Sequence, residues 1–138
     1  MERSLVLVKP DAMERNLAGT IIGRLEQAGL KLLGLKMLRV DRALAEKHYA
    51  VHCDKPFFGE LVDYITSTPI VAAVFEGEDA IARIRRTMGS TDPSKAEAGT
   101  IRRDFGVDIQ RNSTHASDSV ENGGREISLF FDKSEIFG

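Results

Sequence analysis

The first apolar run of the chain predicts a buried β-strand. Ser4 to Lys9 reads SLVLVK, in which leucine and β-branched valine follow one another until Pro10 stops the run. A short continuous apolar run that ends at a turn signal is typical of a buried strand. We therefore expect a strand at residues 4–9, with Lys9 at its carboxyl end and at the end of a sheet.

The next two elements have contrasting patterns. Apolar residues from Leu17 to Ala28 recur at helical spacing, and Gly29 comes directly after them. This pattern predicts an amphipathic helix over 17–28 that stops at the glycine. Residues 30–40, LKLLGLKMLRV, follow Gly29 without a helix cap and predict a second strand.

The middle of the chain predicts a helical hairpin, a strand and a helix. A short helix at 44–49 and a helix with an apolar stripe at 58–65 would form the hairpin. Residues 70–75, IVAAVF, predict a third buried strand. Apolar residues at helical spacing over 81–88 predict a further helix, which Gly89 closes.

The last third contains a long polar segment and a final helix. Residues 90–112 are polar and are punctuated by proline and glycine, which indicates a functional loop with short helical turns. A short fourth strand is expected near His115. Asp118 and Glu121 have the spacing of a capping box, so the last helix should begin near Ser119. Its apolar face would carry Val120, Ile127 and Phe131.

This order of elements predicts helices that cover a sheet, in a single domain spanning residues 1–138. A chain of 138 residues with 42% apolar content can bury one core. Lys and Arg number 19 against 21 Asp and Glu, and the net charge of -2 gives no general basic field. Non-specific nucleic-acid binding is therefore not expected, and any anion site must be local.

The sequence also favours a cytoplasmic protein. Cys53 is the only cysteine and has no CxxC or His/Cys ligand set around it, which fits a reducing compartment. No apolar run approaches the length of a membrane span, so no membrane partner is expected. The amino terminus does not resemble a signal peptide, because Lys9 and Pro10 interrupt its apolar residues at once.

His115 is the first candidate for chemistry. It lies in the stretch NSTHASDSVE, among small hydroxyl, amide and carboxylate side chains. A single histidine in a polar loop is most often only a solvated side chain. A histidine nucleophile, in contrast, needs one exposed ring nitrogen and a hydrogen bond that holds the other. Glu126, on the helix expected just after His115, is a candidate for that bond.

An anion site would need cationic or polar side chains near this histidine. Guanidinium groups fit pairs of phosphate oxygens, although each of these charges, taken singly, is more often part of a solvated surface. The candidates are Lys9, Arg85, Thr91 and Arg102. Phe57 lies off the apolar stripe of its helix and is either a base-stacking platform or a cap on the core. Neither a Walker-type nor a Rossmann glycine motif is present, so side chains would have to bind any nucleotide.

Several blocks of the chain resemble the nucleoside diphosphate kinase family in order and spacing, and the resemblance extends to about Phe131. They are VKPDA (8–12), KPFF (55–58), MGSTDP (88–93), GTIRRDF (99–105) and NSTHASDS (112–119). The resemblance implies an α+β fold, a ferredoxin-like αβ sandwich with a four-stranded antiparallel sheet covered by helices and an inserted helical hairpin. It also implies ping-pong transfer of the γ-phosphate from a nucleoside triphosphate to a nucleoside diphosphate, through phosphohistidine at His115.

The resemblance further implies roles for individual positions. Lys9 and Asn112 would contact the sugar hydroxyls and the terminal phosphate. Phe57 would stack on the base with Leu61 beside it. Ser117 and Glu126 would support the imidazole. The residues expected to line the phosphate path are Tyr49, His52, Arg85, Thr91 and Arg102.

The implied partners are nucleoside di- and triphosphates with Mg2+ bridging their phosphates, and further copies of the chain. Mg2+ would be held by the nucleotide and water, so no metal site built from protein ligands is expected. Family members form tetramers or hexamers, and the short acidic tail after Phe131 leaves the choice between the two open.

Two departures from the family pattern lie near the expected site. Ala116 follows the histidine where glycine is usual, which excludes any backbone torsion that only glycine adopts. Gly123 and Gly124 fall inside the helix that carries Glu126 and would weaken it by roughly 1 kcal/mol each.

Two other classes of protein remain as alternatives at the sequence level. A ferredoxin-like regulatory module would bind a nucleotide without turning it over. A nucleic-acid-binding protein would use Phe57 and the arginine pairs as contacts, but low net charge and the absence of interleaved basic and aromatic residues argue against it.

Overall fold

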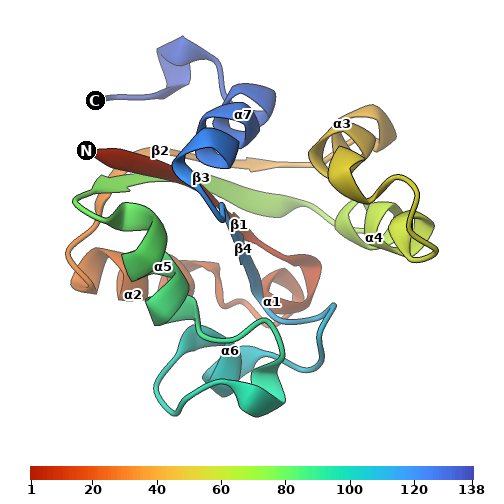
Figure 1. The fold of residues 1–138 in the computed structure, drawn as a ribbon, viewed down its shortest axis with the longest axis horizontal. Helices are drawn as coiled ribbons and strands as arrows, with labels where there is room; N and C mark the ends of the chain where they lie inside the picture. Colours follow the sequence, from red (N-terminus) through yellow and green to blue (C-terminus); the bar gives the residue numbers. More distant parts are fainter.

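The computed structural model describes residues 1–138, which form a four-stranded antiparallel sheet with helices on both faces (Figure 1). The strands are β1 (Glu2–Val8), β2 (Lys31–Leu38), β3 (Ile70–Gly77) and β4 (Thr114–Ala116). Their order in the sheet is β2-β3-β1-β4, and every neighbouring pair is antiparallel. This order and the helices between the strands confirm the predicted α+β, ferredoxin-like fold.

The helices divide between the two faces and one end of the sheet. Helices α2 and α5 cover one face, α7 covers the other, and α3 and α4 form a hairpin beyond the strand ends (Figure 1). The helices are α1 (Pro10–Glu14), α2 (Ala18–Gln27), α3 (Arg42–His48), α4 (Phe58–Ile65), α5 (Ala80–Met88), α6 (Ile101–Phe105) and α7 (Val120–Phe130). Short 3-10 turns occur at η1 (Ala50–His52), η2 (Pro93–Lys95) and η3 (Lys133–Glu135).

Helices cover both faces of the sheet, which explains why polar and apolar residues do not alternate along β1. Side chains of a strand point to opposite faces in turn, so both faces of β1 need apolar residues when both are covered. Leu5 and Leu7 pack in the core cluster that contains residues of α3, α4 and α7. Val6 and Val8 pack in the cluster that contains residues of α2 and α5. None of the helices combines the length and apolar character that a membrane-spanning helix needs.

The structure corrects the expected role of Pro10. The sequence pattern treated this proline only as the end of a strand, but it also begins α1, where it occupies the first turn. A proline fits there because its fixed φ suits the helix and its missing N–H would have no intrahelical partner. Helix α1 was therefore not predicted.

The structure confirms that the last helix begins near Ser119 but corrects its capping residue and its apolar face. Ser119, not Asp118, caps α7, because its hydroxyl accepts a hydrogen bond from the Asn122 backbone N–H at 3.1 Å. Val120 is 55% exposed and does not belong to the buried face. The buried apolar side chains of α7 are those of Ile127 and Phe130, and the buried Phe131 lies just beyond the helix end.

The two glycines of α7 differ in their surroundings. A Cβ at Gly123 would lie 2.6 Å from the Arg3 carbonyl oxygen, whereas a Cβ at Gly124 would meet nothing within 4 Å. Gly123 therefore permits the close approach of α7 to β1. Ala116 lies in β4, pairs with Val6 and is buried in the core, without a positive φ. Alanine thus fits this strand position without strain.

Candidate active site

A cavity of about 410 Å³ lies where β1, β4, the α3–α4 hairpin and α7 meet. It collects nearly all of the predicted site residues, which are far apart in the sequence. Those that line it are Lys9, Tyr49, His52, Leu61, Arg85, Thr91, Arg102, Asn112, His115 and Glu126. The two predicted residues outside the lining are Phe57 and Ser117.

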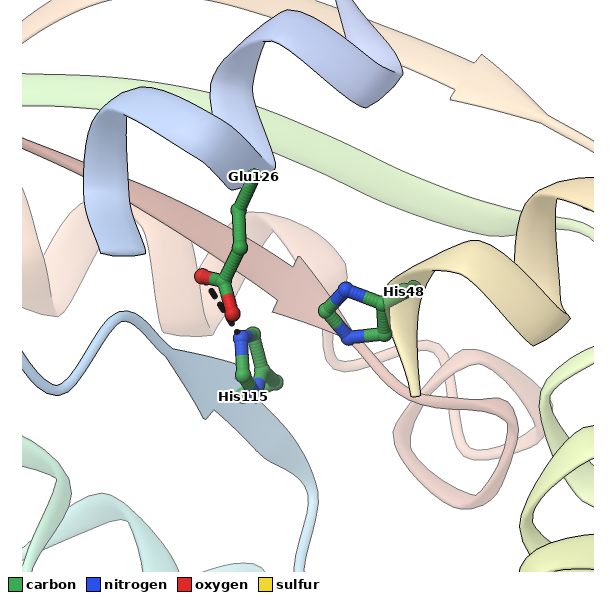
Figure 2. A group of neighbouring side chains, drawn as sticks. All are labelled: His48, His115 and Glu126. Atoms are coloured by element: carbon green, nitrogen blue, oxygen red, sulfur yellow. Dashed lines mark hydrogen bonds and ion pairs between the residues drawn. The ribbon is translucent and has the colours of Figure 1, made fainter. Parts of the chain in front are cut away.

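His115 and Glu126 meet because β4 is followed at once by α7. Antiparallel pairing places His115 opposite Leu7, and Glu126 lies about two turns into α7, which returns over the sheet (Figure 2). The Nε2 atom of His115 lies 3.1 Å from Glu126 Oε1. The Ser117 hydroxyl donates to the same carboxylate oxygen at 2.6 Å. Glu126 is thereby fixed, and it fixes the imidazole in turn.

The electrostatics of this cluster keep Glu126 ionised. Burial alone would raise the pKa of its carboxyl, but hydrogen bonds from His115 and Ser117 and the charge of His115 outweigh burial and lower the pKa to about 2. A carboxylate at neutral pH can only accept hydrogen bonds. Its partner nitrogen, Nε2 of His115, must therefore carry a proton, and in the neutral form of the ring the lone pair is on Nδ1.

Lys9 is held at the carboxyl end of β1 by neutral partners. Its ammonium donates to Asn112 Oδ1 at 2.9 Å and to the Gln110 carbonyl at 3.2 Å. The side-chain amide of Asn112 in turn donates to the Thr91 carbonyl at 2.9 Å. Burial, followed by the charge of Arg102, lowers the pKa of Lys9 to about 8.

Arg102 is anchored in the cavity wall and is not a surface charge. It is 7% exposed and donates to the Gly89 and Thr114 carbonyls at 3.0 and 2.9 Å. Burial, followed by the charge of Arg85, lowers its pKa to about 10, so it remains charged at neutral pH. The alternative interpretation as a solvated charge fits the neighbouring Arg103, which is exposed. Arg85 is exposed as well, but it lines the cavity.

The cavity therefore has an excess of unpaired positive charge. No carboxylate lies within ion-pair distance of the buried Lys9 and Arg102 or of the exposed Arg85, although such pairs occur elsewhere in the chain. Buried cations without a counter-ion are costly unless a ligand supplies the opposite charge. The arrangement fits a polyanionic ligand such as a nucleotide phosphate chain.

Sequence reasoning missed the supporting role of Asp11. This buried side chain accepts hydrogen bonds from the Ser113 backbone N–H at 3.0 Å and from the Tyr64 hydroxyl. Ser113 has a φ of 76°, an uncommon conformation for a residue with a side chain. Asp11 thus holds the strained segment between Asn112 and β4. Its place in the VKPDA block was the only available sequence signal.

Sequence reasoning also missed His48, the last residue of α3. Its side chain is 3% exposed, and neither ring nitrogen has a hydrogen-bond partner. The ring meets that of His115 edge to face, with centroids 4.7 Å apart. Burial, followed by the charge of His115, lowers the pKa of His48 to about 3, so the ring is neutral.

Phe57 lies near the cavity, outside the core. It precedes α4 and is 42% exposed, and its ring centroid lies 5.5 Å from that of His52. Phe58 and Leu61, in contrast, pack against the core cluster. Two exposed apolar side chains that were not predicted, Val51 and Ile109, also line the cavity. This part of the site offers apolar surface to a ligand.

Comparisons with known proteins show the family of this chain. The family model described as nucleoside diphosphate kinase matches residues 2–136. The chain belongs to the nucleoside diphosphate kinase family. It is accordingly an enzyme, a kinase that acts on nucleotides, and the non-catalytic alternative is not favoured.

Similar proteins come from bacteria and archaea. A nucleoside diphosphate kinase of Dehalococcoides mccartyi is 59% identical over 99% of this chain and 96% of its own length. One from Archaeoglobus fulgidus is 57% identical over 99% of this chain and 90% of its own.

Two solved structures have the same fold. The nucleoside diphosphate kinase of Aquifex aeolicus matches with a TM-score of 0.95 and 46% identity over 98% of both chains. That of Halobacterium salinarum, solved in complex with CDP, matches with a TM-score of 0.95 and 50% identity, over 99% of this chain and 91% of its own.

Proposed function

We propose that this kinase carries the phosphate on His115. The observation that supports the proposal is the contact between His115 Nε2 and Glu126, supported by Ser117. It leaves a lone pair on Nδ1, in a side chain that lines the cavity and is 24% exposed. A neutral imidazole with one nitrogen held and the other free has the properties of a nucleophile.

The transfer takes place in two half-reactions. Nδ1 attacks the γ-phosphorus of a nucleoside triphosphate, and the bond from phosphorus to the bridging oxygen breaks, so the nucleoside diphosphate leaves with the electron pair. An oxygen of a second nucleoside diphosphate then attacks the phosphohistidine, and the N–P bond breaks and returns the lone pair to Nδ1. Glu126 stabilises the positive charge on the ring in the first step.

Positive side chains of the cavity would bind the phosphate chain. Lys9, Arg85 and Arg102 carry charges that no carboxylate neutralises, and guanidinium groups stabilise charge on a transferring phosphoryl group. The polar groups expected beside them on the same path are Tyr49, His52, Thr91 and Asn112.

The apolar rim of the cavity would bind the base. The exposed ring of Phe57 offers every base the same stacking surface, and Leu61 lies at the cavity wall beside it. A stacking contact hardly distinguishes one base from another, so we infer broad tolerance of purine and pyrimidine nucleotides.

Mg2+ fits this site as a companion of the nucleotide. Two carboxylates line the cavity, those of Glu126 and Asp118. Glu126 is already hydrogen-bonded to His115 and Ser117, whereas Asp118 is exposed. Mg2+ retains several waters and takes few protein ligands, so Asp118 would contact it through water. When bound, Mg2+ would neutralise charge on the nucleotide phosphates.

We further propose that residues 1–138 form a single kinase domain. Copies of this chain would assemble into a tetramer or hexamer. Leu35 and Met37 are 52% and 65% exposed on β2, the edge strand of the sheet, which leaves apolar surface at an edge that no further strand of the chain covers. The loop at 90–106 is a second candidate contact. A stable, fully active monomer in light scattering at micromolar concentration would contradict this assembly.

We also propose a cytoplasmic location, because the free, exposed thiol of Cys53 fits a reducing compartment.

Steady-state kinetics test the proposed function. A phosphoenzyme mechanism predicts parallel double-reciprocal plots at several fixed concentrations of acceptor. His115→Ala should abolish ATP/ADP exchange while nucleotide affinity stays within about tenfold, roughly 1.4 kcal/mol. Cys53→Ser, purified in the same way, serves as the control and should keep both properties. Intersecting lines, or exchange in His115→Ala above the background of host enzyme, would refute the assignment of His115.

A further inference from the structure

Three side chains in the cavity form a potential ligand set that phosphate transfer does not explain. His48 from α3, His115 from β4 and Glu126 from α7 each offer one ligand atom, and these atoms lie within 4.8 Å of one another. Figure 2 shows them converging from three separate elements. His115 and Glu126 have proposed roles in the transfer, but His48 has none.

His48 provides the independent observation that points to a ligand. Its ring is buried, yet both nitrogens lack a hydrogen-bond partner. Buried polar groups in native structures nearly always have partners, so such an orphan requires an explanation. The ring packs between aromatic neighbours, Tyr49 and Phe130 among them, which hold it beside His115 without hydrogen bonds.

We propose that His48, His115 and Glu126 bind a transition-metal dication, with Zn2+ as its representative, and that the bound ion inhibits the kinase. Two imidazole nitrogens and one carboxylate oxygen, with a fourth position open, form a common zinc ligand set. Mg2+ prefers an all-oxygen octahedral shell and does not suit these ligands. This ligand set would therefore bind an inhibitory transition metal in preference to the Mg2+ that accompanies the nucleotide.

The geometry requires only small movements. In a tetrahedral zinc site with bonds of about 2.0–2.1 Å, the ligand atoms lie about 3.3 Å from one another. The His115 and Glu126 atoms are already 3.1 Å apart, so the adjustment falls mainly on the His48 side chain. Ser117, which donates to the carboxylate at 2.6 Å, would remain as a supporting hydrogen bond outside the metal shell.

Inhibition follows from the chemistry of the neutral imidazole. A neutral ring has one lone pair, and a metal on Nε2 would take it. The proton then moves to Nδ1, which can no longer attack phosphorus. Zinc would also separate His115 from the carboxylate that stabilises the charged ring. This effect rests on the proposed role of His115, whereas metal binding rests on the three side chains alone.

Metal binding is tested on the full-length, nucleotide-free protein. Zn2+ titration by calorimetry should give one site per chain, and Co2+ should give the visible absorption of a four-coordinate ion. His48→Phe keeps the ring packing but removes both nitrogens, and it should weaken Zn2+ binding by at least about tenfold, since even outer-shell changes cost 10- to 100-fold. Cys53→Ser is the control and should bind as the wild type does, because it removes only the exposed thiol.

Inhibition is measured separately, as phosphate incorporated from Mg-ATP at buffered free Zn2+. Wild-type labelling should fall over the range in which calorimetry shows binding, while His48→Phe should be insensitive to that range whatever its basal rate. Unchanged Zn2+ affinity in His48→Phe, or its loss in Cys53→Ser, would overturn the metal site. Zinc binding by a protein that never labels would refute the nucleophile and the inhibition but not the metal site. Normal labelling without zinc binding would refute this inference alone.

Discussion

At the residue scale, Lys9 makes nucleotide binding sensitive to alkaline pH. Burial, with the charge of Arg102, lowers its pKa from 10.5 to about 8, while a bound phosphate would favour the charged form. As the pH rises above about 8, the Lys9 ammonium of the free protein loses its proton, and with it a positive charge that would bind the nucleotide phosphates. The dissociation constant for ADP, measured by calorimetry, should therefore rise by up to about tenfold from pH 7 to pH 9. Lys9→Arg stays charged over this range and should show a flat profile. A flat wild-type profile would contradict this role.

At the element scale, the two adjacent glycines of α7 provide a matched pair of tests. Gly124→Ala should raise the free energy of unfolding by about 1 kcal/mol, because alanine favours the helix and its Cβ meets open space. Gly123→Ala should lower it by about 1–3 kcal/mol, because its Cβ would clash with the Arg3 carbonyl of β1. Urea unfolding measures both values. Changes of the same sign would contradict the packing of α7 described above.

At the scale of the whole molecule, the sequence predicted the fold better than the interior of the site. Buried strands and striped helices leave a local pattern, as the run that ends at Lys9 does, so the sheet and its principal helices could be predicted. His48 and Asp11 leave no such pattern, because their burial depends on contacts between distant parts of the chain. His48 of α3 meets His115 of β4, and Asp11 of α1 meets Ser113 just before β4. Helix α1 was missed because Pro10 marks both the end of a strand and the start of a helix.

The central claim is that His115 forms a covalent bond to the transferred phosphate. The most direct measurement incubates the protein with γ-labelled ATP and Mg2+ and then tests the stability of the bound label. Phosphate on an imidazole nitrogen is labile in acid and stable in alkali, so the account predicts one such phosphate per chain, absent in His115→Ala and released by added nucleoside diphosphate. Label that is stable in acid, or that persists in His115→Ala, would contradict the account.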